Sequence, residues 1–180
     1  AISTTKAANA GLLIRERSAL ESARNIDVVL FDKTGTLTKG EQGVVGIIAD
    51  DEKKLLSIAA SIESDSEHPI AKAIVQKAKD SNVKIQSATN FNALEGRGVT
   101  AKVDGKTYHI GGPQLLKQQK VGLSDKYQKA SDKAHTDGKS IIYLLQDKNV
   151  IGGIMIADVI REESKEAVAK LQASGCLLYT

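Results

Sequence analysis

A short apolar run that ends on an aspartate constrains the fold of this chain more than any other feature. Residues 28–31 read Val-Val-Leu-Phe, and Asp32 follows at once. Four large apolar residues in a row are typical of a strand buried on both faces of a parallel sheet. Gly35 can adopt a backbone conformation that residues with a Cβ avoid. The pattern predicts an α/β fold with a carboxylate at the carboxyl edge of its sheet, where such folds bind ligands.

An aspartate in this place has a specific chemical use. A carboxylate held beside a phosphoryl group can attack it in line and form an aspartyl-phosphate. Lys33, Thr34 and Thr36 would surround the transferred group with a positive charge and hydroxyls. The alternative is a strand followed by an ordinary Asx turn, which an isolated Asp-x-x-Gly would favour.

The whole string Asp-Lys-Thr-Gly-Thr-Leu-Thr at 32–38 resembles the phosphorylation motif of P-type ATPases, ion pumps of the haloacid dehalogenase superfamily. The resemblance implies that Asp32 is the nucleophile, that Lys33, Thr34 and Thr36 assist it, and that Asp32 and the Thr34 carbonyl hold Mg²⁺. Phosphatases of the superfamily carry a second Asp where Thr34 stands. A threonine cannot serve as the general base at neutral pH, so the pattern favours a pump.

A helix-and-hairpin block follows this motif. Apolar residues spaced three and four apart predict a helix over 51–63, with Leu55, Ile58, Ala59 and Ile62 inward, and another from Pro69 onward. Residues 88–111 predict antiparallel strands joined by a tight turn at Asp104-Gly105.

The rest of the chain returns to an α/β pattern. We expect helices over 113–120 and 124–136, a hairpin over 140–156, a helix over 161–174 and a buried strand over 176–179. The fold class is therefore α/β, a truncated Rossmann-like phosphorylation domain with an inserted α+β domain. The expected parts are a connector at 1–23, the phosphorylation domain at 24–40 and 158–180, and the nucleotide-binding domain at 41–157.

A second motif lies in the inserted block. Ser66-Glu67-His68-Pro69 resembles an element of heavy-metal (type IB) P-type ATPases, whose nucleotide domain binds ATP. The resemblance implies that Glu63 accepts a hydrogen bond from the adenine amino group and that His68 orients the purine. Taken alone, a single histidine is more often structural.

Further positions follow from the same resemblance. Gly96, Gly98 and Gly111 would let the backbone approach the nucleotide, and Asp158 and Arg161 resemble a hinge Asp-x-x-Arg that faces the phosphate side. The alternative for Asp158 is the N-cap of a helix with a charged first turn.

The resemblance also implies cofactors and partners. These are ATP and Mg²⁺, a transported metal ion, and the actuator domain of the same pump. Gly111-Gly112-Pro113 resembles the CopB-like copper pumps, so Cu⁺, Ag⁺ or Cu²⁺ is the expected cargo. We expect a cytosolic piece of a membrane pump, because the Thr-Gly-Asp motif of the family breaks off at Thr180. By itself the chain should bind ATP and turn over little.

The amino-acid composition argues against several classes of function and partner. Aromatic residues make up 3% of the chain, which argues against stacking platforms for single-stranded nucleic acid. The net charge of +3 comes from interspersed charges, so we expect no nucleic-acid partner. The single Cys176 excludes an internal disulfide, and we expect it to be a buried small hydrophobe. A soluble phosphatase and a non-catalytic nucleotide sensor remain as alternative functions.

Overall fold

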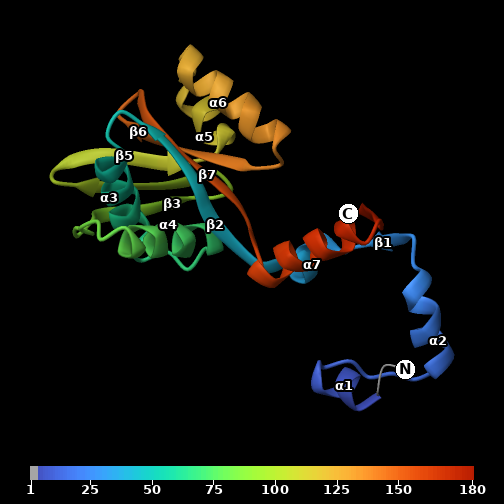
Figure 1. Ribbon diagram of the computed structural model, residues 1–180. Coiled ribbons are helices and arrows are strands. Elements are labelled where there is room, and N and C mark those ends of the chain that lie inside the picture. Colours follow the sequence, from blue (N-terminus) through green and yellow to red (C-terminus); the bar gives the residue numbers. More distant parts are fainter. Residues whose placement is uncertain (1–3) are drawn as a thin grey trace. The chain divides into compact units, whose positions relative to one another are not determined.

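The computed structural model describes residues 4–180, except the side chains of Thr4, Arg17, Leu20 and Arg24. The chain folds as two compact units (Figure 1). The first unit contains the residues up to Lys39 together with Ile160–Thr180, and the second contains Gly40–Val159. The connector expected at 1–23 is described from residue 4 onward, and residues 4–23 group with the first unit.

The second unit is built on a six-stranded sheet in the order β2-β7-β6-β5-β4-β3. The pairings from β3 to β7 are antiparallel. Asp104 and Gly105 both have positive φ, 50° and 74°, and form the predicted tight turn between β4 and β5. The strands are β2 (Thr38–Ala49), β3 (Thr89–Leu94), β4 (Gly98–Val103), β5 (Lys106–Gly111), β6 (Ser140–Gln146) and β7 (Asn149–Ile160).

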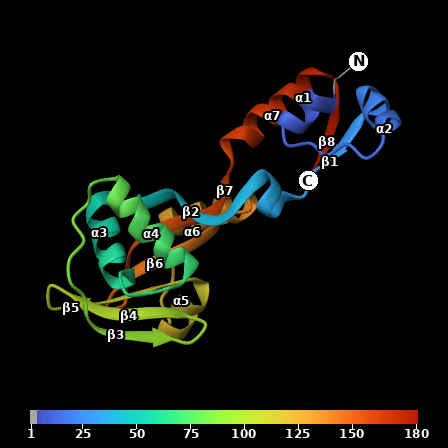
Figure 2. The same cartoon turned by 90° about the horizontal axis from the view of Figure 1, so that it is seen from below.

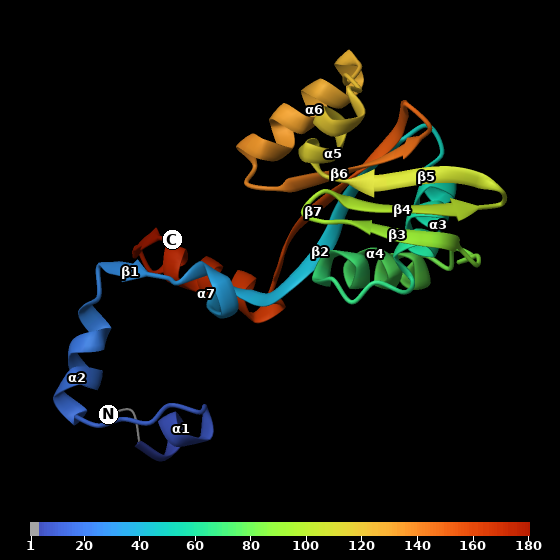
Figure 3. The same cartoon turned by 180° about the vertical axis from the view of Figure 1, so that it is seen from behind.

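Helices cover both faces of this sheet (Figures 1 and 3). α3 (Glu52–Glu63) and α4 (Pro69–Asp80) pack side by side on one face, and α5 (Pro113–Gln119) and α6 (Asp125–Thr136) lie on the other. Asp51 caps α3 by accepting a hydrogen bond from the Lys54 amide at 2.9 Å. The predicted inward face of α3 is confirmed, since all four of its residues are buried.

The alternation of side chains along the strands produces two apolar clusters. Val99, Ala101 and Val103 of β4 point into the larger cluster, beneath α3 and α4. On the opposite face, Tyr143 of β6 packs with Leu115 of α5 and their apolar neighbours. Fully burying one such large side chain contributes about 1.5–3 kcal/mol, so these two layers hold the second unit together.

The first unit contains a pair of parallel strands, visible in Figure 2. In register, Val28 pairs with Leu177 and Leu30 with Tyr179. Gly175, with φ of +86°, follows the end of α7 just before β8, the position at which a glycine in the sequence predicts the end of a helix. The elements are α1 (Thr4–Asn9), α2 (Arg17–Ser22), the 3₁₀ turn η1 (Ala23–Asn25), β1 (Val28–Leu30), the irregular turn η2 (Lys33–Leu37), α7 (Glu162–Ala173) and β8 (Leu177–Tyr179).

The expectation that β1 and β8 are buried is wrong. Val28 and Leu30 are 47% and 78% exposed, and their register partners Leu177 and Tyr179 are 59% and 55% exposed. Side chains paired across a sheet share one face. The two-stranded sheet of the described residues leaves the face that carries these four side chains uncovered. Strand formation was predictable from the apolar runs, whereas burial depends on what else packs there.

Two related expectations need the same correction. Cys176 is only half-buried, and its Sγ lies 3.2 Å from the carbonyl oxygen of Ile26. The apolar spacing of the sequence also predicts an inner face on α7, formed by Ile160, Ser164, Ala167, Val168 and Leu171. Ser164, Val168 and Leu171 are only half-buried, while Ile160 and Ala167 are exposed. The first unit therefore has far less core than the second.

Candidate functional site

Asp32 stands just beyond the paired strands β1 and β8. The strand pairing extends to Phe31, whose amide donates to the carbonyl of Tyr179 at 2.8 Å. Asp32 itself is extended, with φ of −72° and ψ of 130°, and its side chain is exposed. Gly35 has φ of +80°, which confirms that the turn η2 needs a residue without a Cβ. The carboxylate thus lies at the expected edge and is open to solvent.

Thr38 closes the turn that follows Asp32. Its side chain is buried, with 3% exposed. Its Oγ1 accepts a hydrogen bond from the Gly35 amide and donates one to the Lys33 carbonyl, both at 3.3 Å. Sequence reasoning named no role for Thr38, although it is the last residue of the string that identified the motif.

Arg161 binds the same turn from the other end of the chain. Its Nε donates to the Thr38 carbonyl at 3.1 Å, and one terminal nitrogen donates to the Gly35 carbonyl at 3.3 Å. Its backbone amide donates to the Leu37 carbonyl at 3.0 Å. The structure therefore brings Arg161 to the Asp32 turn, where it contacts main-chain carbonyls.

Asp158 does not cap a helix. The N-cap of α7 is Arg161, because β7 continues in extended conformation to Ile160. The carboxylate of Asp158 instead accepts a hydrogen bond from Gln42 Nε2 at 2.5 Å, which joins β7 to β2. The helix-cap interpretation of Asp158 is wrong.

Glu63 is a buried carboxyl at the end of α3, with 9% exposed. Burial raises its pKa above the ordinary value, and a hydrogen bond with Ser66 acts in the opposite direction. Glu63 lines a hollow on the α3–α4 pair. The other residues around this hollow are Ser64, Ser66, Lys72, Val75, Gln76 and Lys79.

His68 occupies the N-cap of α4, and its Nδ1 accepts a hydrogen bond from the Ile70 amide at 3.2 Å. Pro69 follows at the first helical position, where its missing N–H costs nothing. In the neutral ring this arrangement leaves the proton on Nε2. The ring is exposed and does not line the hollow beside Glu63. The structure therefore places Glu63 and His68 at the two ends of one interhelical connection.

Two of the predicted glycines have a packing reason of their own. A Cβ at Gly98 would overlap the carbonyl oxygen of Ile110, and one at Gly111 would overlap that of Arg97. Gly98 also has φ of +129°. The main chain at this end of β4 thus lies so close to the main chain of β5 that neither position has room for a side chain. Gly96, with φ of +67°, has open space around it.

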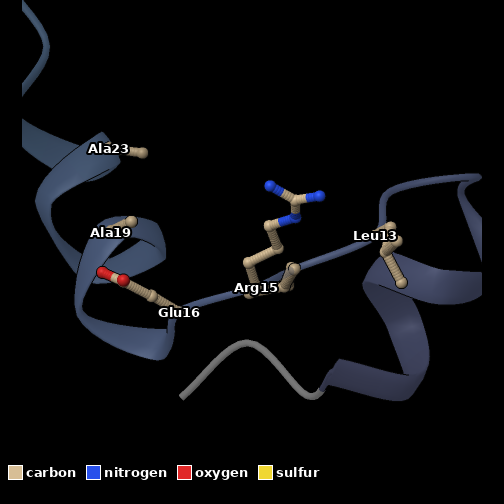
Figure 4. A pocket seen from close by; sticks show the side chains of 6 residues that line it. Leu13, Arg15, Glu16, Ala19 and Ala23 are labelled. Carbon is tan, nitrogen blue, oxygen red and sulfur yellow. The ribbon is translucent and has the colours of Figure 1, made fainter.

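Other candidate sites are weaker. Figure 4 shows a hollow in the N-terminal segment, formed by Leu13, Ile14, Arg15, Glu16, Ala19 and Ala23, which contains none of the predicted site residues. No group of three or more His, Cys, Asp or Glu side chains gathers anywhere in residues 4–180. Over the same residues, no helix combines the length and apolar character that crossing a bilayer requires.

Known proteins resemble this chain over its whole length. The chain is 42% identical, over 184 aligned residues, to the copper-exporting P-type ATPase B of Archaeoglobus fulgidus. That alignment covers 100% of this chain and 26% of the relative, so the chain spans about a quarter of the relative's length.

Solved structures agree. A zinc-transporting PIB-type ATPase superposes with a TM-score of 0.76 at 31% identity, covering 89% of this chain and 26% of the other. The catalytic domain of the CPx-ATPase CopB-B, studied for its changes on nucleotide binding, superposes with a TM-score of 0.58 at 30% identity. That match covers 92% of this chain and 57% of the other. The zinc-transporting protein is named as a PIB-type ATPase, the class of pumps that the sequence motifs resemble. Residues 26–179 match the haloacid dehalogenase-like hydrolases, and the chain belongs to that family.

Proposed function

We propose that the chain is the nucleotide-binding and phosphorylation region of a heavy-metal P-type ATPase, in which ATP phosphorylates Asp32. The observation that carries the proposal is the exposed Asp32 carboxylate directly after β1, followed by a turn whose main chain is held by Thr38 and Arg161. A nucleophile needs this combination of access and fixed surroundings.

The proposed reaction is an in-line displacement. One oxygen of the Asp32 carboxylate forms a bond to the γ-phosphorus as the bond to the departing ADP oxygen breaks. Lys33 supplies a positive charge, and the hydroxyls of Thr34 and Thr36 donate hydrogen bonds to the phosphoryl oxygens. Without a carboxylate at position 34, no group of the turn itself activates water against the aspartyl-phosphate.

The oxygen donors of this turn suit Mg²⁺. The ion prefers one or two carboxylates together with phosphate oxygens and water, and Asp32 and the Thr34 carbonyl would hold it here. When bound, it neutralises charge on the transferred phosphoryl group.

The second unit would bind the nucleotide. The buried Glu63 carboxyl would accept from the adenine amino group, and Nε2 of His68 would donate toward the purine or pack against it. Gly96, Gly98 and Gly111 line the bends at one end of β4 and β5, and we retain them as main-chain contacts to the nucleotide. Asp158 and Arg161 stay assigned to the phosphate side.

The cargo is proposed to be copper or silver, as the name of the archaeal relative and the Gly-Gly-Pro element favour. The similarity to a zinc-transporting pump indicates that this region is shared by pumps for different metals. In the complete pump the region would lie in the cytosol and work with the actuator domain and a membrane domain.

Two measurements test the proposal. In an NMR titration of this chain, ATP should shift amide resonances around 63–68, and Glu63→Ala should weaken the binding. In the complete pump, ATP should leave acid-stable phosphate on the protein, and Asp32→Asn should abolish it. Hydrolysis of small phosphate esters without such an intermediate would favour a phosphatase and contradict the proposal.

A further inference from the structure

We propose that Thr38 and Arg161 are positioning residues that aim the main-chain groups of Thr34 and Thr36 in the Asp32 turn. The inference rests on the proposed phosphorylation of Asp32, since it assigns a role within that same turn. It concerns residues that act through the backbone rather than through contact with the phosphate.

The first observation is that both polar groups of Gly35 are held. Its amide donates to Thr38 Oγ1, and its carbonyl accepts from the Arg161 guanidinium. Gly35 has the least restricted backbone in the turn, with φ of +80°. These two bonds act in addition to the backbone bond from the Thr38 amide to the Lys33 carbonyl, and they fix the peptide groups on either side of Gly35.

The second step follows from peptide geometry. A peptide unit is planar and trans, so its C=O and N–H point in opposite directions. Because the Gly35 amide is fixed on Thr38, the Thr34 carbonyl in the same peptide must point away from Thr38. The Thr36 amide must likewise point away from Arg161, because it shares a peptide with the Gly35 carbonyl. Two side chains therefore set the direction of two groups that the turn offers to a phosphate and its cation.

The placement of Thr38 suits this role. It is one of three buried polar residues in the described part of the chain, together with Ser61 and Glu63. Its single hydroxyl accepts from one peptide of the turn and donates to another, the Lys33 carbonyl. Valine has the same shape and cannot make either bond, whereas serine keeps both.

Arg161 has a matching geometry. Its side chain binds the Thr38 and Gly35 carbonyls while its amide binds Leu37. The planar fork of arginine can reach two carbonyls at once, and a lysine cannot reproduce this. Arg161→Lys therefore keeps the charge and removes the positioning.

The structural arm of the test uses this chain alone, with no nucleotide or metal. Thr38→Val should speed hydrogen exchange of the Gly35 amide by about tenfold or more, and Thr38→Ser should restore it. Ser174→Ala is the matched control, because that hydroxyl bonds to the Lys170 carbonyl at the end of α7. Unchanged Gly35 exchange in Thr38→Val would overturn the inference.

The functional arm uses the complete pump and measures phosphate on Asp32 against Mg²⁺ and ATP concentration. Thr38→Val and Arg161→Lys should each raise the Mg²⁺ concentration for half-maximal phosphorylation by about tenfold. In Thr38→Val the ATP concentration for half-maximal phosphorylation should stay unchanged, and Thr38→Ser should behave as wild type. Arg161 is exposed, so Arg161→Lys carries the test even where Thr38→Val fails to fold.

The outcomes separate the inference from the proposed function. If Asp32 is phosphorylated in the wild-type pump, and Thr38→Val and Arg161→Lys both need the same Mg²⁺ concentration as the wild type, the inference is overturned and the proposed function stands. A wild-type pump that takes no phosphate on Asp32 would overturn both.

Discussion

At the scale of single residues, His68 combines a structural role with a proposed binding role. Its Nδ1 caps α4. His68→Ala removes the cap and should cost about 1 kcal/mol of stability, whereas His68→Asn keeps a capping side chain and should cost a few tenths at most. Urea unfolding measures this difference.

The same pair of variants isolates the contact with the purine. If the ring orients ATP, both variants should weaken binding by about tenfold, the effect of one lost hydrogen bond or packing contact. Wild-type ATP affinity in His68→Asn would show that His68 is only a helix cap.

Glu63 makes stability depend on pH. Burial raises its pKa, so the folded chain holds this proton at pH values where the unfolded chain has lost it. The folded state is therefore favoured at low pH, and this contribution falls as pH rises from the unfolded pKa through the folded one. Glu63→Gln should be the more stable form at pH 7, with the difference shrinking toward acid pH. Urea unfolding of both proteins over a range of pH measures this difference. If the free energy of unfolding depended on pH in the same way in both proteins, this account would be contradicted.

At the scale of secondary-structure elements, Gly98 and Gly111 separate packing from binding. Gly98→Ala and Gly111→Ala should each cost more than about 2 kcal/mol, because the new methyl group meets backbone atoms that cannot move aside. Gly122→Ala is the control, since no atom lies within 4 Å and φ is ordinary. It should change stability by less than about 0.5 kcal/mol.

Thermal unfolding of these variants without nucleotide measures the change in stability, and an ATP titration of the same variants measures binding. If Gly98→Ala were as stable as the wild type and lost only ATP binding, the glycine would serve the ligand rather than the sheet.

Local signals explain which elements the sequence predicts. Capping by Asp51, the Asp104-Gly105 turn and the glycine after α7 each act over a few residues, so helices and hairpins were predictable. β2 was missed, because polar residues and three glycines interrupt its apolar pattern between 38 and 49. The contacts of the Arg161 side chain with this turn span 123 residues of chain, so they leave no local signal. The Thr38 hydroxyl bonds only within the turn, and sequence reasoning named no role for it.

At the scale of the whole molecule, the two units differ in how much core they have. Among the described residues, every buried apolar side chain except Ala7 lies in the second unit. The first unit, in contrast, exposes large apolar residues on β1 and β8. The sequence predicted the strands of both units except β2. It could not show this imbalance, because burial depends on all the packed neighbours together.

Hydrogen exchange should follow the same division. Amides in β6 and in the central part of α3 should exchange only through global opening, whereas those of β1 and β8 should exchange through local opening of much lower free energy. NMR exchange rates in this chain measure both. Equal protection of β1 and β6 would mean that the first unit has a core beyond the contacts described above.

The proposal as a whole depends on where the phosphate goes. The complete pump is incubated with ATP and Mg²⁺, quenched in acid and treated with borohydride, which converts an aspartyl-phosphate to homoserine. Mass spectrometry then locates the change. The account predicts homoserine at position 32, and none in Asp32→Asn. Phosphate on any other residue, or conversion that persists in Asp32→Asn, would contradict it.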